Sequence, residues 1–432
     1  MTTKVIEVRN FIEKFIEDSK KESEKYFAKE GAFTRKCSLN LFTLVILMMS
    51  NSRRTLSVEL FDFFNKIDKP KVTKGAFSKA RYKLKNIFFE DMFKSSTSFM
   101  NSKMNLKKWK GFQICAVDGS TLYLLDGKAI TEEFGGQTNQ YRHTPMARLG
   151  FMVDVLNGIC LQAKIQNYAL GEDEFARQFL KAATQTQLLI YDRLFPSYEL
   201  IIRHLMANVH FVMRCKADMN ITVMRFVASG KKDEIVEFDL TPTAKKALIA
   251  DDIVAPKKVK VRLLRIDIGN EEPEILITSL LDKKTYPYSC FKELYNKRWG
   301  VETYIGKVKN CFQLQVFTGY KVEAIYQDFY LTLIEGNIQN MLIQECEKDV
   351  IKANEGRDFD YAINENVAAG IFKQSIVGLF ITKKTAKFVT QIKMSFIANL
   401  EPIRPGRSFK RIWRVKFARG RHFTDTNYKR CM

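Results

Sequence analysis

The segment 291–310 carries one carboxylate among side chains that bind phosphate. A carboxylate can hold a hard divalent cation, whereas Arg, Lys and Tyr side chains can contact phosphate oxygens. Read as one helix at about 100° per residue, the segment presents on one face Tyr295, Arg298, Glu302 and Lys309. This face suits a metal-bound phosphodiester. The alternative is an ordinary amphipathic helix in which Arg298 and Glu302 form a solvated salt bridge.

Two aspartates upstream are each expected to follow a short buried strand. The apolar run 112–117 ends in Asp118-Gly119, and a second run, 188–191, ends in Asp192. An α/β sheet presents ligands for a site at the carboxyl ends of its strands. Each aspartate taken alone could equally be a turn or cap residue. Together with the helical glutamate, they predict a site of three carboxylates.

The segments around these acids indicate an α/β protein. Asn157-Gly158 lies between the apolar runs 148–156 and 159–166, which is a strong hairpin signal. A helix is predicted from about Glu172 to Thr184. The order of a strand with Asp, a hairpin, a helix, a second strand with Asp and a later helix with Glu is that of a ribonuclease-H-like core.

The sequence predicts four regions along the chain. The fold class is α/β, with a ribonuclease-H-like core, a β-rich insertion, and helical regions at both ends. The predicted bounds are 1–105 for a helical N-terminal DNA-binding region, 106–208 and 273–345 for the catalytic core, 209–272 for the β-rich insertion, and 346–432 for a helical and basic C-terminal region.

Charge indicates the kind of partner. The 432 residues include 70 Lys and Arg against 48 Asp and Glu, a formal net charge of +22. Such an excess favours a polyanion, and we expect nucleic acid rather than a membrane surface. The longest apolar run, 39–49, is too short to span a bilayer. The N-terminus lacks the apolar core of a secretory signal, so a cytosolic protein is expected.

Cysteine and histidine do not indicate a metal site of their own. The eight cysteines form no C-x-x-C pair, and the four histidines lack the spacing of metal ligands. We expect reduced and mostly structural thiols.

Two basic segments are candidate DNA contacts. Thr73 is a plausible N-cap of a helix carrying Lys74, Lys79 and Arg81, and such a helix can lie against a duplex. The stretch 404–430 interleaves basic and aromatic residues, which predicts a segment that follows DNA. For each segment the alternative is a solvated basic surface.

Three motifs together resemble those of the DDE transposases of bacterial insertion sequences, specifically the insertion-sequence-four family. That family has an Asp-Gly-Thr-like motif, an Asp-Arg-x-Phe motif, and a third in which Tyr is followed at fixed intervals by Arg, Glu and Lys. Here the first two motifs are Asp118-Gly-Ser-Thr and Asp192-Arg-Leu-Phe. The third is formed by Tyr295, Arg298, Glu302 and Lys309. Ser120 replaces the commoner Thr, which leaves the acids intact. The likeness continues in 317–337 and extends to 401–408.

The resemblance implies an enzyme that cuts and joins DNA by two-metal chemistry. Asp118, Asp192 and Glu302 would hold two Mg²⁺ or Mn²⁺ ions, and no protein nucleophile is needed.

The resemblance also implies how the chain meets its substrate. Tyr295, Arg298 and Lys309 would hold the phosphates of the transposon ends, and Arg193 is a further candidate for a phosphate contact. Trp299 would pack in the core beneath them, with stacking on a base as the alternative. The implied partners are double-stranded DNA, at transposon ends and target, and a second copy in a homodimeric synaptic complex. No membrane is involved, and the implied location is the bacterial cytoplasm in association with the nucleoid.

Two alternative functions stay open at this point. One is a nuclease of the same fold that hydrolyses DNA without joining strands. The other is a domesticated DNA-binding protein that retains the sheet as a scaffold. Three intact acids argue against the second, because a pure binder has no reason to keep unpaired carboxylates beside phosphates.

Overall fold

The computed structural model describes residues 3–50, 53–254, 256–267 and 272–404. Contacts divide the chain into two compact units, each assembled from separate stretches. The helical unit comprises the described residues within Met1–Met104, Tyr123–Pro145 and Gly306–Met432, and the sheet unit those within Asn105–Leu122 and Met146–Ile305.

A large mixed sheet dominates the sheet unit. Its strands are β1 (Gln113–Tyr123), β2 (Gly136–Thr138), β3 (His143–Asp154), β4 (Ile159–Asn167), β5 (Gln187–Tyr191), β6 (His210–Cys215), β7 (Asp233–Asp239), β8 (Lys258–Ile266) and β9 (Glu274–Thr278). Among the described residues, the strand order is β2-β3-β1-β5-β6-β9-β8-β7, with β4 also paired to β3. Of these strands, β2 and the start of β3 belong to the helical unit.

Parallel pairing at the centre of the sheet explains the apolar runs in the sequence. Strand β1 runs parallel to β5, and β5 runs parallel to β6. All five residues of β5 are buried, as expected for a parallel strand covered on both faces. The predicted hairpin is confirmed, because β3 and β4 pair antiparallel around Asn157-Gly158.

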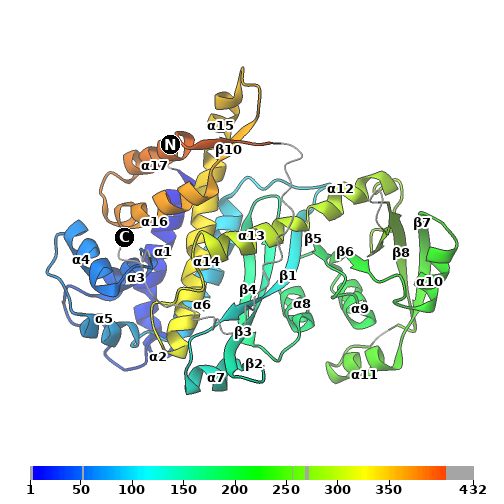
Figure 1. Cartoon of the computed structure of the whole chain (residues 1–432), viewed down its shortest axis with the longest axis horizontal. Helices are drawn as coiled ribbons and strands as arrows, with labels where there is room; N and C mark the ends of the chain where they lie inside the picture. The colour runs from blue at the N-terminus through cyan, green and yellow to red at the C-terminus, as the bar shows by residue number, and fades with distance from the viewer. Residues whose placement is uncertain (1–2, 51–52, 255, 268–271, 405–432) are drawn as a thin grey trace. The chain divides into compact units, whose positions relative to one another are not determined.

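Helices cover both faces of the central strands (Figure 1). On one face, α8 (Glu172–Lys181) and α9 (Tyr198–Met206) pack against Cys115, Val117, Leu189 and Tyr191. On the other, α12 (Phe291–Asn296) packs against Ile114, Leu188 and Ile190. The unit also contains α10 (Ile221–Ala228), α11 (Pro242–Ala250), the 3-10 helix η2 (Tyr288–Cys290) and most of α13 (Trp299–Asn310).

The helical unit is built around one long helix. Its elements are α1 (Lys4–Asp18), η1 (Ser19–Glu22), α2 (Ser23–Tyr26), α3 (Leu41–Met49), α4 (Leu56–Lys66), α5 (Lys74–Arg81), α6 (Asn86–Lys103), α7 (Lys128–Phe134), α14 (Val322–Glu345), α15 (Glu347–Asn354), β10 (Tyr361–Ile363), α16 (Glu365–Ile381), α17 (Thr385–Ile397) and β11 (Leu400–Pro402). Helix α14 packs against α6, α3, α1, α16 and α17 and is buried along most of its length. Figure 1 shows it in yellow among these helices.

Local sequence signals explain where the N-terminal helices begin. The predicted buried helix is α3, whose N-cap Asn40 accepts a hydrogen bond from the backbone N–H of Thr43 at 2.9 Å. Thr73 caps α5 as predicted and accepts from the N–H of Ala76 at 3.1 Å. No helix in the described part of the chain is long and apolar enough to cross a bilayer.

The predicted four regions differ from the two observed units. The boundary near residue 105 coincides with one edge of the sheet unit, whereas the stretch 306–345, expected in the core, groups with the helical unit. The stretch 209–272 contributes strands to the same sheet and also contains α10 and α11. Part of the predicted basic C-terminal segment, 405–432, lies outside the described residues.

Candidate active site

The first two acids lie at adjacent positions on neighbouring parallel strands. The last paired residues of β1 and β5 are Val117 and Tyr191, and Asp118 and Asp192 follow them directly. Neighbouring strands are about 4.8 Å apart. Since side chains alternate between faces of a sheet, both aspartates fall on the face that α12 covers.

One detail of the sequence prediction is wrong. Strand β1 does not end before Asp118 but continues to Tyr123, although its fully buried part stops at Val117. The reason is that β1 has a second neighbour, β3, on the side away from β5. Asp118 therefore marks the end of the parallel pairing rather than the end of the strand.

The segment carrying Glu302 is two helices rather than one. Helix α12 ends at Asn296 and α13 begins at Trp299. Across the junction, backbone N–H groups bond three residues back, as from Arg298 to the carbonyl of Tyr295 at 2.9 Å. Such a tight turn eclipses side chains at positions i and i+3, so Tyr295 and Arg298 still share a side, with the guanidinium carbon 5.9 Å from the Tyr295 ring.

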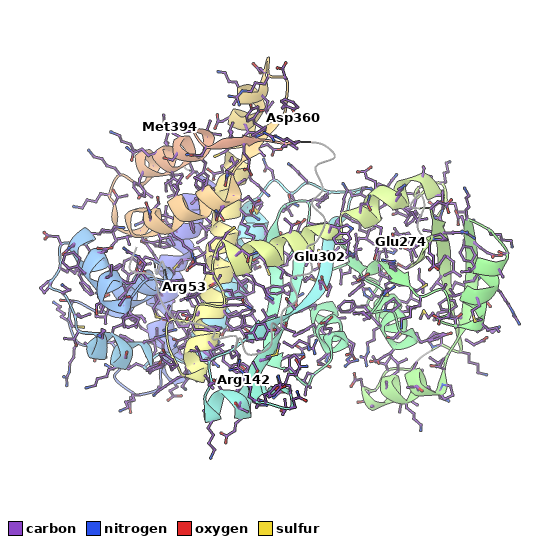
Figure 2. All side chains as sticks on the ribbon, in the orientation of Figure 1. Arg53, Arg142, Glu274, Glu302, Asp360 and Met394 are labelled. Carbon is purple, nitrogen blue, oxygen red and sulfur yellow. The ribbon has the colours of Figure 1, made fainter. Side chains whose placement is uncertain are left out.

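Tyr295 and Arg298 each bond to one of the acids. The Tyr295 hydroxyl donates to Oδ1 of Asp192 at 3.4 Å. Nη1 of Arg298 donates to Oε1 of Glu302 at 2.9 Å, and Figure 2 labels Glu302 on α13. Both donors are 4% exposed. The alternative interpretation treats Arg298 and Glu302 as a solvated salt bridge. In the structure the Arg298 side chain is buried and only the Glu302 side chain is partly exposed.

A glycine lets α13 come close to the sheet. A Cβ built on Gly300 would lie 2.9 Å from Cβ of Val155, which follows β3 directly. Any larger residue there would push away the first turn of α13, which carries Glu302. The close approach thus fixes the third acid relative to the strands that carry the other two.

Burial and charge act together on Asp118. Burial is the main reason why the pKa of Asp118 is raised to about 6, and nearby Glu172 and Glu302 raise it further, while the Gly119 N–H and Arg298 oppose the shift. The carboxylates of Asp118 and Glu302 and the Arg298 guanidinium thus interact at one place in the sheet unit.

This shift predicts how cation binding depends on pH. If Asp118 is a metal ligand, a cation below about pH 6 would have to displace its proton, so apparent Mn²⁺ affinity should fall about tenfold per pH unit. Above pH 7 the affinity should level off. Titrating the protein with Mn²⁺ between pH 5 and pH 8, with free Mn²⁺ followed by electron paramagnetic resonance, measures this. A constant affinity over the whole range would contradict it.

The same shift predicts an effect on folding. A carboxyl group whose folded pKa lies above its unfolded value stabilises the fold below the unfolded pKa, and this contribution is lost as pH rises through the folded pKa of about 6. Asp118→Asn should therefore raise the free energy of unfolding at pH 7.5, by up to about 2 kcal/mol. At pH 4, denaturant unfolding should find the two proteins nearly equal in stability.

The other predicted contacts fall in different environments. Arg193, Lys74 and Lys79 are exposed. Lys309 lies two turns beyond Glu302, on the part of α13 that belongs to the helical unit. Trp299 is 52% exposed, so the prediction that it packs in the core is wrong; the Arg298 guanidinium carbon lies 4.6 Å from its ring.

Arg81 requires a correction. Its side chain is 1% exposed and donates to Asp328 at 2.8 Å and to Gln327 at 2.6 Å. A guanidinium committed to a buried carboxylate does not contact a phosphate on a duplex. We therefore remove Arg81 from the predicted DNA contacts.

Sequence reasoning missed one carboxylate beside the site. Glu172 lies against Gly119 and forms an ion pair with Arg148 at 3.0 Å. The glycine directly after the first acid was the one signal that something approaches closely there. Gly119 alone could not identify Glu172 as its neighbour, because Glu172 lies on a helix that is distant in sequence.

The donor set suits a hard cation and a phosphate. Among the described residues, no three His, Cys, Asp or Glu side chains already gather as a metal cage. The three acids nevertheless supply only oxygen ligands, which Mg²⁺ and Mn²⁺ accept. Nε of Arg298 is buried and has no hydrogen-bond partner in the described structure. A buried donor without an acceptor fits an anionic group such as a phosphate oxygen.

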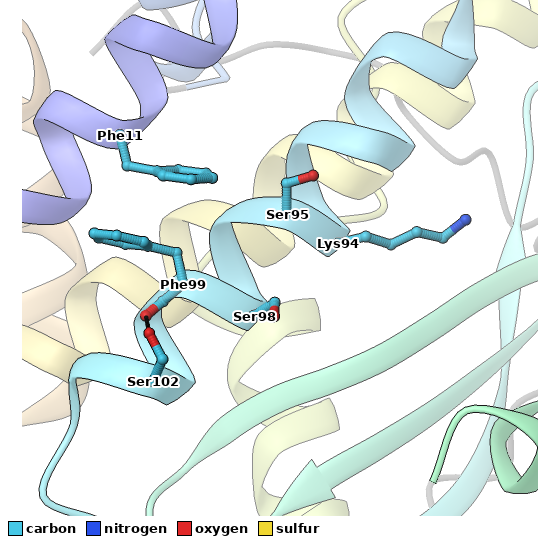
Figure 3. A pocket seen from close by; sticks show the side chains of 6 residues that line it. All are labelled: Phe11, Lys94, Ser95, Ser98, Phe99 and Ser102. Atoms are coloured by element: carbon cyan, nitrogen blue, oxygen red, sulfur yellow. Dashed lines mark hydrogen bonds between the residues drawn. The ribbon is translucent and has the colours of Figure 1, made fainter.

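A pocket in the helical unit has different chemistry. It lies between α1 and α6, where Phe11 and Phe99 stack with ring centroids 4.4 Å apart (Figure 3). None of the six described residues that line it carries a carboxylate. Its lining residues are Phe11, Lys94, Ser95, Ser98, Phe99 and Ser102.

Comparison with known proteins identifies the family. A search among curated proteins returns no match. Among solved structures, the chain is similar to the piggyBac transposase synaptic complex with hairpin DNA, at 9% identity and a TM-score of 0.43, covering 94% of this chain and 86% of that one. The family model described as "Transposase DDE domain" matches residues 109–334, more than half of the 432 residues, and this chain therefore belongs to the DDE transposase family.

Proposed function

We propose that the chain is the transposase of an insertion sequence of the insertion-sequence-four type, which binds the terminal inverted repeats of its element, cuts the DNA and joins the ends to a target. The observation that carries this proposal is the pairing of β1 with β5, which sets Asp118 beside Asp192. Family membership and the ion pair between Arg298 and Glu302 support it. The order of β1, the β3–β4 hairpin, α8, β5 and α13 supports a ribonuclease-H-like core.

In this proposal, Asp118, Asp192 and Glu302 hold two Mg²⁺ or Mn²⁺ ions. When bound, the ions supply activation of water or of a DNA 3′-hydroxyl and stabilise the leaving oxygen. The chain supplies the geometry. Parallel strands fix the two aspartates, and the close approach at Gly300 fixes Glu302.

Tyr295 and Arg298 have two tasks in the proposal. Their bonds to Asp192 and Glu302 orient the carboxylates. Both side chains would also donate to a substrate phosphate, and the hydrogen bond from the Arg298 guanidinium would be charge-assisted, the stronger kind. The unpartnered Nε of Arg298 supports such a contact.

Tyr295→Phe tests the smaller of these contributions. It removes one hydroxyl that donates at 3.4 Å to Asp192, and a net hydrogen bond is worth about 0.5–1.5 kcal/mol. We expect cleavage to slow roughly 2- to 10-fold, measured as single-turnover cleavage of an end duplex. A loss as large as that of an acid substitution would mean that Tyr295 takes part in the chemistry itself.

Further DNA contacts and the assembly complete the proposal. Arg193, Lys309, Lys74 and Lys79 contact the DNA backbone, and the excess of positive charge attracts the duplex. Two copies act together on two ends, because cutting and joining both ends requires two active sites.

A joining assay separates this function from its alternatives. The protein is incubated with labelled duplex carrying the element's end, supercoiled target plasmid and Mg²⁺. Cleaved ends covalently linked to plasmid are expected. Cleavage without linkage would favour a nuclease of the same fold, and binding without cleavage would favour a domesticated DNA-binding protein.

A further inference from the structure

A fourth carboxylate lies against the strand that carries the first acid. Glu172 begins α8, and a Cβ built on Gly119 would lie only 2.5 Å from the Glu172 carboxylate carbon. The carboxylate therefore rests directly on the Gly119 backbone. The N–H of Gly119 donates to Oδ1 of Asp118 at 2.8 Å. Glu172 thus packs against the residue whose N–H donates to Asp118.

A second glycine explains why α8 reaches this position. A Cβ on Gly150 of β3 would lie 2.3 Å from the ring of Phe175, which is buried against the sheet. Glu172 and Phe175 are three residues apart and so share one side of α8. Because Gly119 and Gly150, on neighbouring strands, have no side chains, this side of α8 packs closely against the sheet.

Arg148 holds the Glu172 carboxylate in place. Nη1 of Arg148 donates to Oε1 of Glu172 at 3.0 Å. Its Nε and Nη2 both donate to the carbonyl of Tyr168, at 3.3 and 3.2 Å, and the guanidinium carbon lies 4.9 Å from the Tyr168 ring. An arginine fixed by two hydrogen bonds to the Tyr168 carbonyl and by the Tyr168 ring leaves its carboxylate partner little freedom.

We propose that Glu172, tethered by Arg148, is a positioning residue for Asp118, an inference that rests on the proposed function of Asp118 as a metal ligand. Because side chains alternate along β1, position 119 faces α8 and Asp118 faces the other side. Glu172 therefore acts through the Gly119 peptide and is not itself a ligand. It keeps that N–H directed at Oδ1, so that the second oxygen of Asp118 is presented to the cation.

The test is Mn²⁺ binding to the full chain without DNA, followed by electron paramagnetic resonance. Glu172→Ala leaves a gap at Gly119, and we expect binding to weaken about 10- to 100-fold, as for other residues that orient metal ligands. Glu172→Gln keeps the shape and its amide oxygen can still accept from Arg148, so its affinity should stay within about twofold, because this ion pair is partly accessible to solvent, with side chains 22% and 25% exposed, and contributes little through charge alone.

A control and a second variant keep the test decisive. Glu174→Ala removes a carboxylate of the same helix that bonds Arg177 and Gln178, and it should bind Mn²⁺ like the wild type. If Glu172→Ala does not fold, Arg148→Gln, which removes the ion pair with Glu172 together with the hydrogen bonds to the Tyr168 carbonyl, should still weaken binding about 10-fold, the lower end of the range for residues that orient metal ligands.

Two kinds of result overturn different claims. If Glu172→Ala binds Mn²⁺ like the wild type, or if Glu172→Gln binds as weakly as Glu172→Ala, the positioning role is wrong. The role is also wrong if Arg148→Gln has the Mn²⁺ affinity of the wild type. If instead the wild type does not bind Mn²⁺, or Asp118→Asn binds equally well, the proposed metal site itself is wrong.

Discussion

Glu302→Gln should lower DNA cleavage and strand transfer by about 10³-fold or more, an increase of about 4 kcal/mol in the activation free energy. The substitution is nearly isosteric, and the new amide oxygen can still accept from Arg298, whose Nη1 lies 2.9 Å from Oε1 in the wild type. What it removes is the charge that a cation needs. Binding of the end duplex should be nearly unchanged, and gel-shift and cleavage assays on the same labelled duplex measure both.

Glu293→Gln is the matched control. Glu293 lies on α12, its side chain is 80% exposed, and it pairs with Lys297 at 3.0 Å. The same change in charge there should leave cleavage at the wild-type level. Cleavage by Glu302→Gln at the wild-type rate would refute the assignment of three acids. If neither the wild type nor the variant cuts but both bind, a DNA-binding regulator becomes the better explanation.

Apolar runs that end in aspartate could be recognised in the sequence because parallel strands are buried on both faces. The run 188–191 is the buried strand β5, and Asp192 follows it. The register between β1 and β5 was not predictable, because it depends on how two distant segments meet. That register is what sets Asp118 beside Asp192.

The predictions that failed depend on features that helical periodicity does not report. The break at 297–298 arises from hydrogen bonds that reach three residues back instead of four, which leaves the sequence pattern almost unchanged. The spacing of Arg81 from apolar residues indicated that it is buried, but its charge favoured its interpretation as a DNA contact. Arg81 stands four residues after Phe77 and three before Leu84, both buried, and therefore lies on the apolar stripe of its segment.

The burial of Arg81 has a consequence for the stability of the helical unit. Asp328 on α14 pairs with Arg81 at 2.8 Å and with Arg53 at 3.2 Å, and it accepts from the Thr318 backbone N–H at 2.7 Å. All three charged side chains are at most 7% exposed. Although its burial opposes ionisation, Arg81, Arg53 and these hydrogen bonds hold the pKa of Asp328 below its usual value.

Asp328→Asn should therefore destabilise the protein strongly. The volume is kept, but two buried guanidiniums lose their anionic partner, and breaking a buried pair in this way costs about 3–5 kcal/mol. For a unit of this size we expect the midpoint of thermal unfolding to fall by roughly 10 °C, measured by circular dichroism at pH 7.5. Because the pKa of Asp328 is lowered, its contribution is present above the unfolded pKa and is lost as pH falls, so the difference between the proteins should shrink towards pH 3.

Asp18→Asn provides the comparison for this variant. Asp18 pairs with Lys21 at 2.6 Å on the surface, and its replacement should leave the unfolding midpoint unchanged, since exposed pairs contribute little. If Asp328→Asn also unfolds at the wild-type midpoint, the ion pairs of Asp328 with Arg53 and Arg81 do not stabilise the helical unit. A large loss of stability without loss of Mn²⁺ binding at low temperature would instead place Asp328 in the framework of the helical unit and outside the metal site.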